Sequence, residues 1–94
     1  QAYVFMQPLE PTKNDEVTIR IRTLKGNVKD AVLRYSNEVD VTLTAAAKYK
    51  EIPMQFEKVD DTGYYEYFVC KIPKQSKPYM YHFKLSNKKE TIYR

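Results

Sequence analysis

Several residue types are scarce in this chain, which has one cysteine, one histidine, two glycines and no tryptophan. A single cysteine excludes an internal disulfide, and the apolar neighbours of Cys70, Val69 and Ile72, indicate a small core residue. Gly26 and Gly63 alone do not make a glycine-rich phosphate loop. No stretch approaches the roughly 18 apolar residues that a membrane-spanning helix requires, and none resembles a secretory h-region. The sequence therefore predicts no membrane partner.

The charge balance is basic but evenly mixed. Sixteen Lys and Arg residues stand against twelve Asp and Glu residues, with a net charge of +4. Scattered lysines commonly keep strand edges and loops soluble, so we prefer this interpretation to a nucleic-acid patch. The length of 94 residues predicts one domain. Because the chain starts at Gln1, we expect a piece of a longer protein, and the localisation of that parent stays open.

Short alternating runs rich in β-branched and aromatic residues dominate the chain, and helical periodicity is nearly absent. The clearest run is 17–23, whose aliphatic residues share one face and whose threonine and arginines share the other. Because strand side chains alternate, we expect Arg20 and Arg22 to lie in water. Further strands are expected at 28–36, 39–43, 49–59, 64–72, 79–85 and 90–93, with an edge strand at 2–6 and one helical turn at 44–48.

Turn signals separate these strands. Lys25, Gly26 and Asn27 predict one turn, and the segment 60–63 predicts a hairpin loop that ends on a glycine able to adopt positive φ. Pro53 predicts an edge or a bulge within 49–59. Six or seven short strands at about ten-residue spacing predict an all-β sandwich or small barrel. We expect residues 1–15 to be an N-terminal connecting segment and residues 16–94 to be the folded domain.

No set of residues has the composition of a catalytic site. His82 is the single histidine and has no partner at metal-ligand spacing, since a structural zinc site usually needs four Cys or His ligands. Asp60 and Asp61 form a carboxylate pair that hairpin formation explains, and calcium binding by these two and Asp40 is a weak alternative. The sequence thus predicts no catalytic residue, no metal and no cofactor.

Tyrosine is unusually abundant, with nine residues. Tyr65 and Tyr67 fall on the less apolar face of their predicted strand, and Tyr49 falls near a strand end. Ordinary packing, with hydroxyl groups reaching the rim, is one interpretation. The other is a platform for a carbohydrate or a protein partner, because tyrosine suits exposed faces and sugar stacking. Tyr49, Tyr65 and Tyr67 are therefore the candidate binding residues.

Several of these segments follow an order that resembles a known family. The segments are Glu16–Thr23 with Lys25–Val28, Ala31–Tyr35, Lys50–Met54, Gly63–Phe68 and Tyr79–Ser86. Together they resemble the immunoglobulin-like N-terminal domain of neopullulanases, cyclomaltodextrinases and maltogenic amylases, over about residues 16–94. The resemblance implies an antiparallel immunoglobulin-like β-sandwich of about seven short strands, placed ahead of a catalytic barrel of the α-amylase family.

The resemblance also implies what the domain does. The catalytic carboxylates of such enzymes lie in the barrel, so this domain is expected to be non-catalytic. Its expected roles are binding of α-glucan oligosaccharides such as starch, homodimerisation, and shaping of an active site. Two other classes stay open on the residues alone. One is an immunoglobulin-like spacer or adhesion module of a surface protein, and the other is a basic oligonucleotide-binding barrel that uses Tyr65 and Tyr67.

Overall fold

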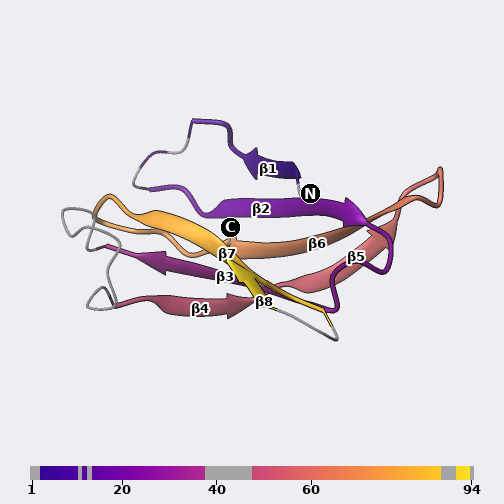
Figure 1. The fold of residues 1–94 in the computed structure, drawn as a ribbon. Helices are drawn as coiled ribbons and strands as arrows, with labels where there is room; N and C mark the ends of the chain where they lie inside the picture. The colour runs from indigo at the N-terminus through magenta and orange to yellow at the C-terminus, as the bar shows by residue number, and fades with distance from the viewer. Residues whose placement is uncertain (1–2, 11, 13, 38–47, 88–90, 94) are drawn as a thin grey trace.

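A computed structural model describes residues 3–10, 12, 14–37, 48–87 and 91–93, and within them every regular element is a strand. Figure 1 shows the strands stacked in two layers. The strands are β1 (Tyr3–Gln7), β2 (Val17–Leu24), β3 (Asp30–Ser36), β4 (Lys50–Pro53), β5 (Gln55–Val59), β6 (Tyr65–Ile72), β7 (Met80–Ser86) and β8 (Thr91–Tyr93). The strand predicted at 39–43 and most of the helical turn predicted at 44–48 lie outside the described residues.

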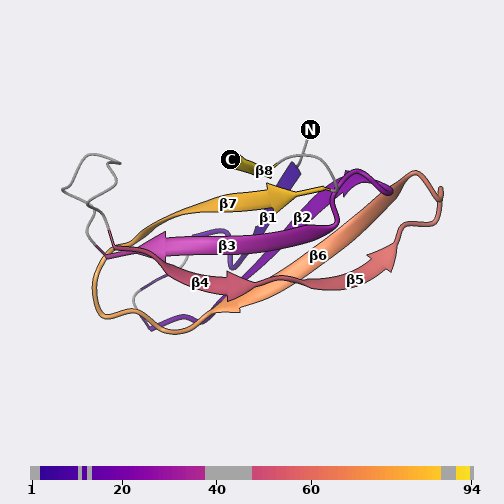
Figure 2. The same ribbon diagram turned by 60° about the horizontal axis from the view of Figure 1, so that its bottom comes forward.

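The strand order is that of an immunoglobulin-like sandwich. One sheet has the order β1-β2-β6-β5 and the other has the order β4-β3-β7-β8, with antiparallel pairing throughout. In immunoglobulin lettering these are the ABED sheet and the C′CFG sheet. Figure 2 shows the strands of one sheet running obliquely across those of the other. The predicted fold class is confirmed, and small barrel closure does not occur among the described strands.

The core lies between the two sheets and follows the period of two that the sequence shows. In β2 and β6 the predicted inward faces are buried, and β3 and β7 contribute from the other layer. The buried apolar residues are Val17, Ile19, Ile21, Ala31, Leu33, Tyr35, Met54, Phe68, Cys70, Ile72, Phe83 and Leu85. Tyr79 and Tyr81, which were expected to point inward with Phe83 and Leu85, pack against this core but are only partly buried.

One strand prediction is wrong, because the segment 49–59 forms two strands in different sheets. β4 pairs with β3 and β5 pairs with β6, so the chain changes layer between Pro53 and Gln55. Met54 sits at the crossing point: its side chain is buried, and its N–H donates to the Ala31 carbonyl at 2.8 Å. Strand propensity alone does not reveal such a change, because the residues on both sides of the crossing favour strands. Ile52 and Met54 pack at the core, whereas Phe56, the next residue in phase, is 55% exposed.

The N-terminal segment is more than a connection. β1 pairs with β2 from Tyr3↔Arg22 to Gln7↔Thr18, which extends the sheet upstream of residue 16. An edge strand was predicted at 2–6, and among the described residues it is present as Tyr3–Gln7. The physical reason is that the outer edge of β2 offers unpaired backbone groups, and β1 satisfies them.

The predicted hairpin loop at 60–63 is confirmed. The Gly63 N–H donates to the Asp60 carbonyl at 3.0 Å, and the φ of Gly63 is 79°, a value that favours glycine. The Asp60 carboxylate accepts hydrogen bonds from the Thr62 hydroxyl at 2.8 Å and from the Tyr65 N–H at 3.2 Å. The loop thus joins β5 to β6 at the end of the first sheet.

Candidate binding surfaces

Two of the three candidate tyrosines lie on the outer face of the β1-β2-β6-β5 sheet. Tyr65 and Tyr67 alternate with inward residues of β6, and Tyr67 is directly opposite Arg22 of β2. On the other side of β2, Tyr3 of β1 is opposite the same arginine. We call this surface the tyrosine–arginine face, which consists of Tyr3, Phe5, Arg22, Lys58, Tyr65 and Tyr67.

Arg22 is held between two tyrosine rings. Its guanidinium carbon lies 4.6 Å from the ring centroid of Tyr3 and 4.5 Å from that of Tyr65. The two rings come from the strands on either side of β2, so they approach the arginine from both flanks. A cation at these distances is attracted by the negative faces of the rings, and the contacts also restrict the long side chain. Arg20 and Arg22 were expected to lie in water; both are on the outer face of β2, but both are half-buried rather than fully exposed.

A β-bulge in β5 brings two consecutive side chains to this outer face. The register between β5 and β6 shifts between Phe56 and Lys58, so both Glu57 and Lys58 reach residues that lie outside the core. Lys58 Nζ lies 5.6 Å from the ring centroid of Tyr67, which is also 6.3 Å from the ring of Phe5. Each candidate tyrosine of this face therefore already has a cation against its ring.

Arg20 and Glu57 form a bidentate ion pair beside these aromatic residues. Arg20 Nε and Nη2 donate to the two carboxylate oxygens of Glu57 at 3.0–3.2 Å. Because β6 lies between β2 and β5 in the sheet, the pair spans that middle strand. The Arg20 guanidinium lowers the pKa of the Glu57 carboxyl from its ordinary value, mainly through the hydrogen bonds.

A shallow groove of about 540 Å³ runs along this surface. Phe5, Arg20, Glu57, Lys58 and Tyr67 belong to its lining, which continues onto the exposed Leu9. The tyrosine–arginine face is thus a broad, largely aromatic surface with fixed charges, and its concavity is small.

The third candidate residue, Tyr49, is on the other side of the sandwich. It precedes β4, and its ring meets the ring of His82 edge-on at 4.8 Å, while the Arg34 guanidinium carbon lies 4.8 Å from the Tyr49 ring centroid. Arg34 in turn pairs with Glu51 at 3.4 Å. Burial, and then the positive charge of Arg34, lowers the pKa of His82. The structure therefore joins Tyr65 and Tyr67 but separates Tyr49 from them.

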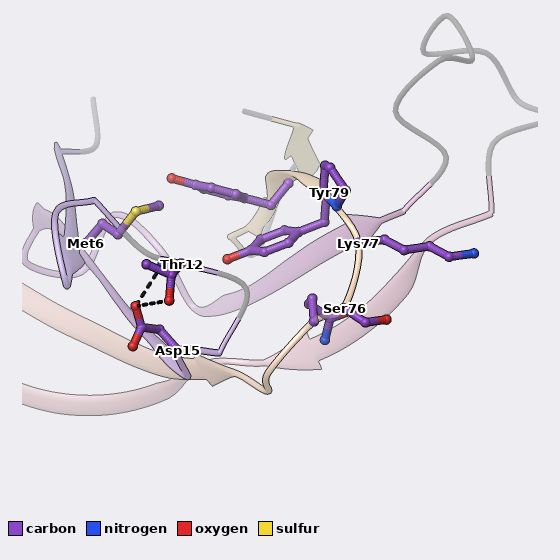
Figure 3. Close-up of a pocket in the computed structure, with 9 residues that line it drawn as sticks. Met6, Thr12, Asp15, Ser76, Lys77 and Tyr79 are labelled. Atoms are coloured by element: carbon purple, nitrogen blue, oxygen red, sulfur yellow. Dashed lines mark hydrogen bonds between the residues drawn. The ribbon is translucent and has the colours of Figure 1, made fainter.

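A second concave site, the end groove, lies between the N-terminal segment and the loop before β7. It has a volume of about 470 Å³ and is lined by Met6, Thr12, Asp15, Gln75, Ser76, Lys77, Pro78, Tyr79 and Tyr81. Figure 3 shows Thr12 and Asp15 on one side, Ser76 and Lys77 on the other, and the Tyr79 ring between them. The Asp15 carboxylate accepts hydrogen bonds from the Thr12 N–H at 2.8 Å and hydroxyl at 3.1 Å. These bonds lower the Asp15 pKa.

The end groove was missed by reasoning from the sequence. Its tyrosines were assigned to the core, and its two sides come from segments sixty or more positions apart in the chain. Likewise Tyr3, Phe5 and Arg22 were not linked to Tyr65 and Tyr67. A signal was present in the alternation of aromatic residues in 3–7, but pairing β1 with β2 was needed to read it.

The surfaces offer binding groups rather than reactive ones. In the described part of the chain, no group of three or more His, Cys, Asp or Glu side chains is placed to hold a metal ion. Cys70 is buried in the core, and burial raises the pKa of its thiol to about 11. No helix among the described residues is long and apolar enough to cross a membrane.

The fold and these surfaces define an immunoglobulin-like β-sandwich that presents aromatic and charged contact surfaces. Comparison with known protein families matches residues 6–94 to the family described as "Alpha amylase, N-terminal ig-like domain". The match covers nearly the whole chain, and the chain belongs to this family. It is thus an accessory domain of an α-amylase-family enzyme, in which catalysis belongs to another domain of the parent chain.

Proposed function

We propose that this domain stands ahead of the catalytic barrel of an α-glucan-acting glycoside hydrolase of the neopullulanase, cyclomaltodextrinase or maltogenic amylase type. Membership of the α-amylase N-terminal family supports an accessory role, and the ordered strand motifs support this group of enzymes. The tyrosine–arginine face packs against the catalytic barrel of the parent chain and helps to shape its active site. The family match favours this role over a spacer or adhesion module.

The observation that carries the proposal is the composition and shape of the tyrosine–arginine face. Tyr3 and Phe5 are 53% and 46% exposed; Tyr3 is directly opposite Arg22, and the Phe5 ring lies 6.3 Å from the ring of Tyr67. Tyrosine, phenylalanine and arginine are enriched in protein interfaces, and exposed apolar patches of this kind mark contact sites. Because cations already lie against the rings of Tyr65 and Tyr67, these rings are less suited to stacking on a sugar.

The test uses the full-length enzyme that carries this domain. A Phe5→Ser/Tyr67→Ser variant removes two aromatic contacts of the face. Tyr64→Ser is the matched control, since Tyr64 is 70% exposed and lies in the hairpin loop beyond the face. We expect calorimetry to show one coupled unfolding transition for the wild type and the control. The face variant should give two separate transitions and a raised KM.

Two outcomes would contradict this proposal. If the face variant unfolds and turns over substrate as the control does, the face carries no contact. If the variant converts a dimer into a monomer without uncoupling the domain from the barrel, the face serves dimerisation instead.

The end groove supports a second candidate function, which is binding of α-glucan oligosaccharide. Its half-buried tyrosines provide apolar surface, and hydroxyl, amide and carboxylate groups surround them, which is the usual lining of a polar ligand site. A Gln75→Ala/Ser76→Ala variant of the full chain should lose retardation in native gels that contain soluble starch. The Phe5→Ser/Tyr67→Ser variant should stay retarded. Equal retardation of the wild type and the Gln75→Ala/Ser76→Ala variant would exclude the end groove.

A further inference from the structure

Within the part of the chain that the structure describes, no acidic side chain pairs with Arg22, whereas the neighbouring arginine has such a partner. Arg20, two residues away on the same face of β2, is bound by both carboxylate oxygens of Glu57. Among the described residues, the guanidinium of Arg22 lies against the rings of Tyr3 and Tyr65, and its Nε is buried without a hydrogen-bond partner. The sheet therefore neutralises one arginine and leaves the charge of the other uncompensated.

The surroundings of Arg22 hold its side chain in place and leave its terminal nitrogens as hydrogen-bond donors. Tyrosine rings lie against the guanidinium from both flanks and Nε is buried, so the terminal nitrogens are the groups left to bind an acceptor. Guanidinium nitrogens form a planar fork that matches the two oxygens of a carboxylate. Exposed apolar side chains lie nearby: Tyr3 and Phe5 on β1, and Leu24, which is opposite Tyr65. A surface that packs on them would exclude water from an ion pair formed at Arg22 and strengthen it.

We propose that Arg22 anchors the tyrosine–arginine face by receiving the carboxylate of an Asp or Glu side chain from the catalytic barrel of the parent chain. This inference rests on the docking role proposed above and adds the chemistry of the partner surface. A neutral α-glucan has no charge to complement Arg22. The occupant is therefore a protein surface that carries an acidic residue.

A second copy of the same face is a poor occupant. In a two-fold contact each residue meets the equivalent surface of the other copy, so Arg22 and Lys58 would face cations. The two acids in the strands of this sheet are already engaged, because Glu57 is held by Arg20 and Glu66 accepts a hydrogen bond from the Gly26 N–H at 3.0 Å. Charge complementarity therefore points to a different, acidic surface.

The experiment places a reactive amine at this position in the full-length enzyme. Arg22→Lys is conservative, and a carbodiimide joins an amine to a carboxylate only when the two are in contact. We expect mass spectrometry to find a cross-link from position 22 to an Asp or Glu of the catalytic barrel, and to find none at this position in the wild type. A cross-link only within this domain, only to a second copy, or no cross-link would overturn the inference.

A charge reversal gives an independent readout. We expect Arg22→Glu to lose the coupled unfolding transition, whereas Lys29→Glu, the same charge change at an exposed residue before β3, should keep it. If Arg22→Glu stays coupled, the inference is wrong. The two proposals can be told apart. If Phe5→Ser/Tyr67→Ser uncouples the two unfolding transitions but no cross-link forms at position 22, only the role of Arg22 is rejected. If Phe5→Ser/Tyr67→Ser still unfolds in one coupled transition, the docking role itself is rejected.

Discussion

The ion pair between Arg20 and Glu57 should stabilise the first sheet by a measurable but small amount. The pair joins β2 to the bulged edge strand β5 across β6, and its side chains are 36% and 27% exposed. Exposed ion pairs contribute about 0.2–1 kcal/mol, and two-pronged arginine–carboxylate geometry favours the upper end. We therefore expect a coupling energy of about 1 kcal/mol from a double-mutant cycle of Arg20→Gln and Glu57→Gln.

The coupling should depend on pH in a defined direction. The pKa of Glu57 is lowered from its ordinary value of 4.5 in the folded state by its hydrogen bonds to Arg20. The contribution of the pair is thus fully present above pH 4.5 and is lost as the pH falls through the lower folded pKa. Arg20 stays protonated throughout, because the same contact raises its pKa further.

Urea unfolding followed by tyrosine fluorescence provides the assay, since the domain has nine tyrosines and no tryptophan. The cycle would be measured near neutral pH, in acid and at high salt, where screening should reduce the coupling. A coupling energy near zero at neutral pH, or one that persists unchanged after Glu57 is protonated, would refute the ion pair. The single variant Glu57→Gln also serves as a control for the acid measurement.

Other expected outcomes follow from burial and backbone geometry. Leu33 is 0% exposed, so Leu33→Ala should lower the free energy of unfolding by about 3 kcal/mol in urea titrations. Val32 lies on the opposite face of β3, so Val32→Ala should lower it by less than about 1 kcal/mol. Gly63 has a φ of 79°, and Gly63→Ala should cost about 1–2 kcal/mol in the same assay. Cys70 should react with iodoacetamide at mildly alkaline pH only on unfolding, because burial raises its pKa to about 11; rapid alkylation of the native domain would contradict this.

Prediction from the sequence succeeded where a pattern is local. The alternation in 17–23 identified β2 and its buried face, and the same reasoning identified the inward residues of β6. The hairpin at 60–63 was predictable because its aspartate and glycine have fixed roles in such loops. The outward position of Tyr65 and Tyr67 was also predictable, because they occupy the alternate positions of β6.

The same reasoning failed where distant segments meet. The chain changes sheet at Met54, directly after Pro53, but strand-forming residues stand on both sides, so the pattern did not show that the two halves join different sheets. Tyr49 seemed equivalent to Tyr65 by composition, yet it lies against His82 on the other sheet. Grouping of candidate residues depends on strand order, which local periodicity does not encode.

Local alternation and turn chemistry by themselves determined the strands, most of their buried faces and the class of fold, since each depends on neighbouring residues and a period of two. The tertiary structure alone decided that Tyr3, Arg22 and Tyr65 form one cluster, and that Glu57 neutralises Arg20 but not Arg22. Those contacts depend on the order β1-β2-β6-β5 and on the bulge in β5. Strand order and register arise from burying both sheets together, which is a property of the whole chain.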